Sequence, residues 1–400
     1  MRKIFLVPTL MLMYVLAVCG ASRADIVYTA EDGTSRSLGG IEVEGAESID
    51  ISKLSPIKTG LKEGARVSAF WGNQQPRVLL TEPGASDGDA AYIYTPNNWE
   101  EEPSEQTLTG TLALRGASAS RQGNSLFTAS QSCLTEYSAS SYAPTGRVYI
   151  CTEGDRITSG EDVLVNGTVI YGLFSVREPE SDGPYLSSKL VLLDGQLNEQ
   201  GRYDNFNVGP QAVALAATSD GKIAVAYRGE EDWKGGIDLC YRGALSHLIS
   251  GDVSGDQYGA IPTLCSDGDS GLYFVGQKQG SGIAPVNTLY RWKSDGTFSA
   301  IPSGEASSSF VKVAWDDTHK LLAMATAEKI VVFQDDTVLR TFTSADLGGT
   351  VTSMAATIDS GSSDESSSSN CGALSLGSAA LLAPLTLLCG KKARSRVGGR

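Results

Sequence analysis

Histidine is almost absent from this chain, whose 400 residues include only His247 and His319. A nucleophilic serine needs a histidine base that a carboxylate holds in place, and zinc sites rely on histidine or on closely spaced cysteines. The seven cysteines contain no Cys-x-x-Cys pair. The sequence therefore argues against a zinc site and offers little material for serine catalysis.

Basic residues are also scarce. The chain has 32 Lys and Arg against 46 Asp and Glu, which gives a formal net charge of −14. The segments 1–24 and 371–400 hold eight of the basic residues and no acid, so the body 25–370 has 24 basic against 46 acidic residues, a net charge of −22. Such a charge repels nucleic acid phosphates and anionic lipid headgroups. We expect no nucleic acid partner, and the composition is compatible with a cationic or neutral ligand.

Residues 1–24 have the pattern of a secretory signal peptide. Two basic residues precede the apolar stretch 4–20, and small residues lead to a cleavage point between Ala24 and Asp25. An uncleaved membrane anchor is one alternative. Lipidation of Cys19, which follows a lipobox-like "LAV", is another. We expect cleavage after Ala24 and export of the protein.

The other end combines a Ser-rich polar segment, 358–370, with an apolar segment, 371–390, and a basic tail, 391–400. The polar segment cannot build a core and should act as a tether. The apolar segment begins with Cys371 and has about the minimum length that crosses a bilayer. The basic tail would hold that end in the cytoplasm.

Tether, cysteine, apolar span and basic end together resemble the CTERM class of bacterial C-terminal sorting signals, in particular the Synerg-CTERM and MYXO-CTERM types. The resemblance covers about 30 residues. It implies that a sorting protease of the envelope removes the span at Cys371 and leaves the body at the cell surface or in the medium. A plain C-terminal membrane anchor is the alternative. Both place the body outside the cytoplasm, with membrane contact through this segment.

Four cysteines remain in the body: Cys133, Cys151, Cys240 and Cys265. An exported protein meets an oxidising compartment, and an even count permits two disulfides. Three pairings are possible. We expect Cys133–Cys151 and Cys240–Cys265, because these pairs close the shortest loops.

Three stretches of the body share one pattern of an apolar strand, an Asp-centred turn and a second apolar strand. Asp-Gly between apolar runs is a strong hairpin signal, because both residues tolerate the positive φ of such turns. The three stretches are 212–229, 261–277 and 310–327, and each is followed by a further strand, turn and strand at 236–250, 287–301 and 329–343. Four short strands in about 45 residues are typical of a β-propeller blade.

Fainter units extend this pattern upstream, so that six units fit between residues 65 and 345. A further first strand at 351–357 has no strands after it, and the strands 25–32 and 39–45 have no first strand before them. Joining these ends into a composite blade would close the ring and remove the sheet edges. We therefore predict an all-β propeller over 25–357 with seven blades. Six or eight blades, or a set of β-sandwich domains, remain alternatives.

The stretch "CSDGDSG" (265–271) is spelled like the nucleophile loop of a chymotrypsin-like protease. Ser270, however, falls in the turn of a repeated hairpin, and His247 precedes it by only 23 residues. We interpret the stretch as a turn. Calcium could bind this turn or the segment 250–259, but neither has a regular ligand spacing, and Asp and Gly are common in solvated turns.

No catalytic constellation was found. The Asp boxes of sialidases, the paired Gly-His and Trp-Asp signals of WD40 repeats and a recurring tryptophan motif of quinone-binding propellers are all missing. We predict an exported binding module whose rim, at loops 84–108 and 178–188, meets a protein, small-molecule or glycan ligand. The alternative is a lactonase- or lyase-like enzyme with a metal in the central channel. A third possibility is a subunit of a surface assembly.

Overall fold

The computed structural model describes most of the body and neither end of the chain. The described residues are 26–33, 35–44, 50–54, 56–72, 75–82, 90–94, 106–107, 114–119, 124–130, 132–179, 185–204, 211–228, 235–242, 244–249, 258–278, 285–317 and 319–356. The predicted signal peptide with its cleavage point, the tether and the sorting signal with Cys371 lie outside them. Within the described residues, no helix has the length and apolar character needed to cross a membrane.

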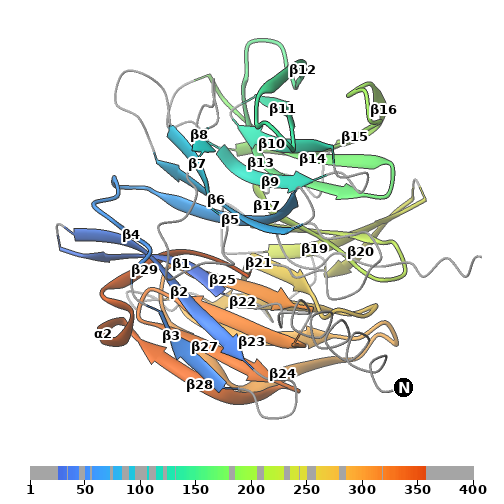
Figure 1. The fold of residues 1–400 in the computed structure, drawn as a ribbon. Coiled ribbons are helices and arrows are strands. Elements are labelled where there is room, and N and C mark those ends of the chain that lie inside the picture. Colours follow the sequence, from blue (N-terminus) through green and yellow to red (C-terminus); the bar gives the residue numbers. More distant parts are fainter. Residues whose placement is uncertain are drawn as a thin grey trace, which may run out of the picture.

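Seven sheets of antiparallel strands form the molecule (Figure 1). Blade 1 contains β5 (Arg66–Gly72), β6 (Gln75–Glu82), β7 (Ala90–Tyr94) and β8 (Gln106–Thr107). Blade 2 contains β9 (Leu114–Ala119), β10 (Ser125–Ser130), β11 (Cys133–Ser138) and β12 (Pro144–Ile150). Blade 3 contains β13 (Ile157–Asn166), β14 (Val169–Arg177), β15 (Tyr185–Leu193) and β16 (Glu199–Asp204).

The next three blades follow the same plan. Blade 4 contains β17 (Gln211–Ala217), β18 (Ile223–Arg228), β19 (Gly235–Tyr241) and β20 (Ala244–Ile249). Blade 5 contains β21 (Ala260–Ser266), β22 (Leu272–Lys278), β23 (Val286–Trp292) and β24 (Phe298–Ser307). Blade 6 contains β25 (Val311–Asp316), β26 (Leu321–Thr326), β27 (Lys329–Gln334) and β28 (Thr337–Thr343).

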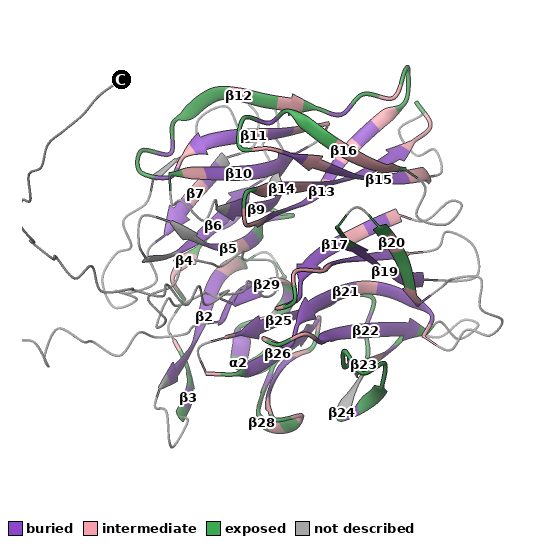
Figure 2. Ribbon diagram, turned by 90° about the vertical axis from the view of Figure 1, so that its right-hand side faces the viewer, coloured by how far each residue is buried: buried purple, intermediate pink, exposed green. Residues whose placement is uncertain are grey.

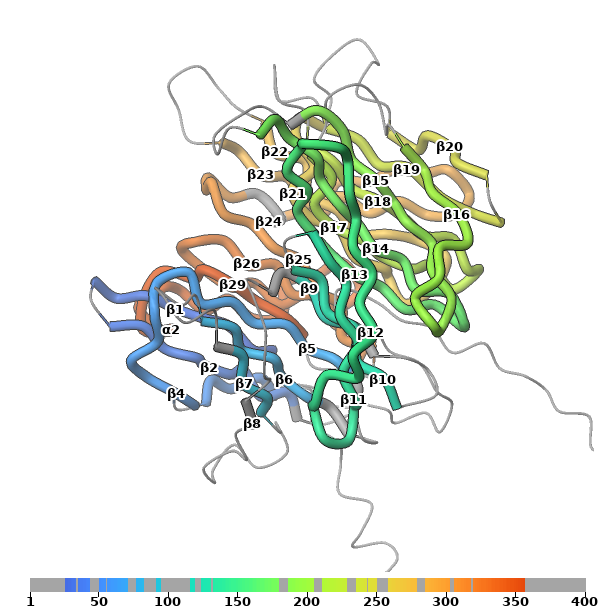
Figure 3. The backbone as a smooth tube through the Cα atoms, turned by 90° about the horizontal axis from the view of Figure 1, so that it is seen from above, coloured from blue at the N-terminus to red at the C-terminus, as the bar shows by residue number. Residues whose placement is uncertain are grey.

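Blade 7 joins the two ends of the body. Its strands run in the order β29 (Thr350–Ala356), β1 (Ile26–Asp32), β2 (Ser35–Glu44) and β3 (Asp50–Lys53), with β4 (Lys58–Thr59) also paired to β2. The register places Ile26 opposite Ala356 and Tyr28 opposite Met354, and Figure 3 shows β1 and β29 side by side. The predicted seven-bladed propeller with a composite closing blade is confirmed.

The first strands of the seven blades form the inner ring, because each of them contacts the first strand of the next blade. Small side chains such as Ala69, Ala117, Ala214 and Ala314 are buried on these strands and allow them to approach closely. The outermost strands β12, β16, β20 and β28 are largely exposed (Figure 2). Burial therefore falls from the axis to the rim, as the repeated pattern of apolar first strands predicts.

Because neighbouring strands of a blade run in opposite directions, the ring has two different faces. Turns between first and second strands, and between third and fourth strands, share one face, which we call the turn face. Links between second and third strands share the opposite face with the crossovers from blade to blade, and we call this the crossover face. The helix α2 (Ser344–Leu347), capped by Thr343, forms the crossover from blade 6 to blade 7.

The turn at 267–271 lies on the turn face, between β21 and β22, as predicted. The Asp267 carboxylate accepts hydrogen bonds from the backbone N–H of Gly271 at 2.9 Å and of Asp269 at 3.0 Å. Ser270 Oγ donates to Ser294 Oγ at 2.9 Å in the neighbouring turn. The motif is thus a hairpin turn closed by its own aspartate.

The same turns connect neighbouring blades. The backbone N–H of Ser219 in blade 4 donates to the carbonyl of Asp269 in blade 5 at 3.0 Å. Arg291 in blade 5 pairs with Asp267 at 3.0 Å and with Asp336 in blade 6 at 3.3 Å. Asp267 and Asp336 thus have a structural role on the turn face.

Candidate functional site

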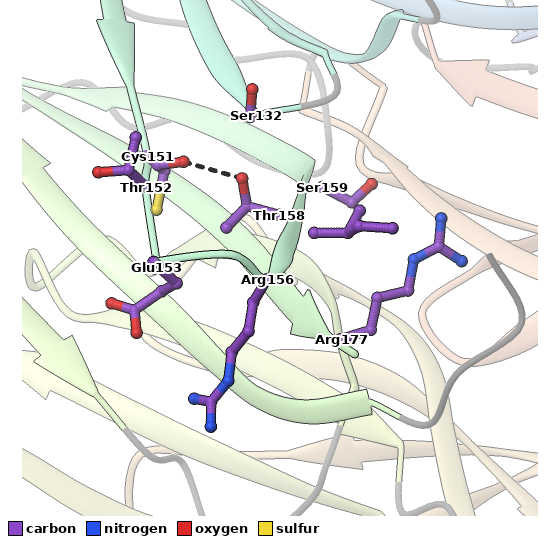
Figure 4. A pocket seen from close by; sticks show the side chains of 10 residues that line it. Ser132, Cys151, Thr152, Glu153, Arg156, Thr158, Ser159 and Arg177 are labelled. Carbon is purple, nitrogen blue, oxygen red and sulfur yellow. Dashed lines mark hydrogen bonds between the residues drawn. The ribbon is translucent and has the colours of Figure 1, made fainter. Parts of the chain in front are cut away.

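A polar cavity of about 560 Å³ opens on the crossover face, where the chain passes from blade 2 to blade 3. It lies around the crossover 151–156 and the ends of β13 and β14. Figure 4 shows the side chains that line it, among them Ser132, Cys151, Glu153, Arg156, Thr158 and Arg177. Its size is in the range of small-molecule sites, about 300–1,000 Å³.

Backbone hydrogen bonds fix the crossover. The N–H of Cys151 donates to the Ser132 carbonyl at 2.8 Å, and Thr158 Oγ1 donates to the Cys151 carbonyl at 2.8 Å. Between them the N–H of Arg156 donates to the Glu153 carbonyl at 3.0 Å, which closes a tight turn. Gly154 takes φ +58° in this turn, a conformation that favours glycine. The cavity wall is therefore built from ordered backbone.

An ion-pair network lies beside the cavity. The Lys189 side chain is buried and pairs with Glu153, and it also pairs with Asp204 at 3.0 Å. Burial alone would lower the pKa of this ammonium group, but the hydrogen bonds to the two carboxylates outweigh it and raise the pKa. Arg202 lies 3.6 Å from Glu153. The carboxylate of Glu153 therefore faces two cations.

The outer strands of blades 2 and 3 are tied together next to this network. Tyr149 on β12 donates to Glu199 on β16 at 2.7 Å, and Arg202 donates to the Tyr149 hydroxyl at 3.0 Å. Burial and the bond to Glu199 raise the pKa of Tyr149, while the bonds from Arg202 and Tyr149 hold the pKa of Glu199 below its usual range. These contacts join the outer strands of blades 2 and 3 beside the cavity.

The thiol of Cys151 lines the cavity but has low reactivity. Burial raises its pKa to about 11. The thiolate is the reactive form of cysteine, so this group remains a neutral thiol near pH 7 and can contribute only a weak hydrogen bond.

The predicted disulfides are wrong, because Cys133, Cys151, Cys240 and Cys265 are all free thiols in the structure. Cys133 lies opposite Ile150, so Cys151, one residue further, points to the other face of the sheet. Cys240 and Cys265 lie in blades 4 and 5 and pack in different core clusters. Proximity in sequence did not bring either pair together.

The acids on the inner strands also have structural roles. Asp162 on β13 is buried and accepts hydrogen bonds from the backbone N–H of Leu215 in blade 4 at 2.9 Å and of Val163 at 2.8 Å. Ser118 and Thr263 accept equivalent inter-blade bonds. Among the described residues, no group of three or more His, Cys, Asp and Glu side chains is placed to hold a metal ion. The calcium candidate 250–259 lies mostly outside them.

Of the two loops predicted to bind a ligand, 84–108 lies mostly outside the described residues and 178–188 partly so. The second begins directly after Arg177 and so adjoins the cavity. The cavity residues themselves were not predicted. They come from three separate segments, and only the positive charge of Arg156 and Arg177 in an acidic chain could have drawn attention to them.

Comparisons with known proteins support the fold alone. No family model matches the chain, and no curated protein matches it. A solved structure of a protein from Lactobacillus plantarum is 11% identical, with 83% of this chain and 99% of that chain covered and a TM-score of 0.56. A functionally unknown protein from Desulfotomaculum acetoxidans is 12% identical over 83% and 98% of the two chains, with a TM-score of 0.52.

A third solved structure is the β-propeller domain of the Trilobed protease from Pyrococcus furiosus. It is 11% identical over 80% of this chain and 98% of that chain, with a TM-score of 0.46.

Proposed function

We propose that this chain is an exported β-propeller that works as a binding module at the bacterial cell envelope. The observation that carries the proposal is the polar cavity on the crossover face, which is open and has ordered walls. Binding sites are concave and largely pre-formed, with a few placed polar groups. The turn face, in contrast, connects blades through the Ser219–Asp269 backbone bond and the Arg291–Asp336 ion pair.

The proposed location of the module rests on the two ends of the chain. The signal-like segment 1–24 supports export, and the tether 358–370 with the apolar and basic segments after it supports sorting to the surface. A sorting protease would act at Cys371, so that the protein touches the membrane only before processing. The ligand on the crossover face is a protein, a small molecule or a glycan.

Site-specific photo-crosslinking in the expressing cells tests this function. Benzoylphenylalanine replaces Thr152, which is exposed at the cavity, or Lys293, which is exposed on the turn face and serves as the control. We expect adducts of higher mass from position 152 and none from position 293. Equal labelling at both positions, or adducts from 293 alone, would contradict a binding role for the crossover face.

A further inference from the structure

We infer that the cavity between blades 2 and 3 binds a small polyhydroxy ligand that carries one anionic group. The inference rests on the proposed binding function and names the ligand class of the same site. Three observations lead to it: the cations of the lining, the state of its one carboxylate, and its hydroxyl groups.

Two guanidinium groups line the cavity from different elements. Arg156 belongs to the crossover and Arg177 ends β14, and Figure 4 shows their guanidinium groups at separate points of the lining. The exposed Arg156 side chain makes no hydrogen bond or ion pair in the described part of the chain. Arginine presents a planar fork of donors that fits carboxylate and phosphate oxygens. An anionic group is the natural partner for it.

The one carboxylate of the lining does not oppose this. Glu153 is bound by Lys189 and faces Arg202, and these two cations are shared with Asp204 and Glu199. Asp155 and Glu178, the sequence neighbours of the two arginines, are outside the lining. The lining itself therefore holds two guanidinium groups against one carboxylate, a formal charge of +1.

This local charge differs from the charge of the whole protein, which is −14. At physiological salt, charges separated by more than about 8 Å are largely screened. A direct contact with Arg156 or Arg177 acts over a much shorter distance. The net charge slows the approach of an anion, whereas the contact decides its affinity.

The remaining lining favours a ligand with several hydroxyl groups. Ser132, Thr152 and Ser159 supply hydroxyls that both donate and accept. The two guanidinium groups lie apart, so they would meet two different acceptors of one ligand, such as the anionic group and a ring hydroxyl. The anionic group is a carboxylate, as in a sugar acid, or a phosphate, as in a sugar phosphate.

Isothermal titration calorimetry on the protein purified from the envelope tests the inference with three probes: galacturonate, its methyl ester and galactose 1-phosphate. We expect galacturonate or galactose 1-phosphate to bind, and the uncharged ester to bind at least tenfold more weakly. The probe with the higher affinity identifies the anionic group. Lost charge-assisted hydrogen bonds have effects of this size.

Two variants locate the site. Arg156→Gln and Arg177→Gln should each lower the affinity for the charged probe at least tenfold, while Arg242→Gln, an exposed arginine on the turn face, should leave it unchanged. Circular dichroism checks the fold of each variant. Because Arg156 is exposed, its substitution should disturb the fold less than that of Arg177. Equal binding of acid and ester, or wild-type affinity in Arg156→Gln, would overturn the inference.

The outcome can be separated from that of the binding function. If none of the three probes binds while position 152 still gives adducts in cells, the binding module stands and the anionic polyhydroxy ligand is wrong. If position 152 gives no adducts either, both proposals fail.

Discussion

The inter-blade bond of Asp162 gives the sharpest prediction about the stability of the ring. This side chain is 3% exposed and accepts two backbone hydrogen bonds, one from Leu215 in the next blade and one from Val163. In Asp162→Ala both N–H groups lose their acceptor inside the core. A buried donor without a partner costs about 1–3 kcal/mol, so the free energy of unfolding should fall by about 2–6 kcal/mol.

Urea unfolding followed by circular dichroism measures the loss. Asp162→Asn keeps one carbonyl oxygen as an acceptor and should fall about halfway between the wild type and Asp162→Ala. Asp295→Ala is the control, because Asp295 caps an exposed turn through Thr297 and joins no blades. A loss below about 0.5 kcal/mol in Asp162→Ala, the usual range of surface substitutions, would refute the reasoning.

Three further predictions follow from the same structure. Met354→Asp places a charge on the closing strand β29, where the side chain is 1% exposed, and urea unfolding should show a loss of at least about 3 kcal/mol; a smaller loss would mean that β29 does not close the ring. Carbamidomethylation of the denatured, unreduced protein should label all four cysteines of the body, because all are free; a mass with two or more unlabelled would show a disulfide. Burial raises the pKa of Asp238 against the opposing effect of His247, so this group stabilises the fold at low pH and the contribution is lost as the pH rises above about 4. The unfolding free energy of Asp238→Asn relative to the wild type should therefore increase from pH 4 to pH 7, and a constant difference would contradict it.

The ring and its closure could be predicted because their signals are local and repeated. Asp-centred turns between apolar strands recur in blades 4 to 6, and strands left without partners at both ends of the body point to one shared blade. The first strands of blades 2 and 3 lack such a signal. The strand β9, "LRGASA", is made mostly of small residues. The strand β13, "ITSGEDVLVN", is mostly polar in its first half. Contacts with neighbouring blades, which no local pattern encodes, hold these strands in place.

The cavity and the thiols could not be predicted for a related reason. Ser132, the crossover 151–156 and Arg177 meet only because blades 2 and 3 stand side by side. Cys133 lies on β11 and Cys151 directly follows the neighbouring strand β12, yet the alternation of side chains places them on opposite faces of the sheet. The function of a propeller depends on residues that are distant in sequence and close in space, and the repeated fold alone does not determine it.

One measurement tests the central claim, an exported binding module that works without a metal, most directly. Native mass spectrometry gives the intact mass of the protein recovered from the envelope and the medium of the expressing cells, before and after treatment with a chelator. We predict a body that runs from Asp25 to near Cys371 and a mass that the chelator does not change. Loss of one ion per chain would point instead to the channel-metal enzyme, and a chain that still begins at Met1 and ends at Arg400 would contradict both signal cleavage and sorting.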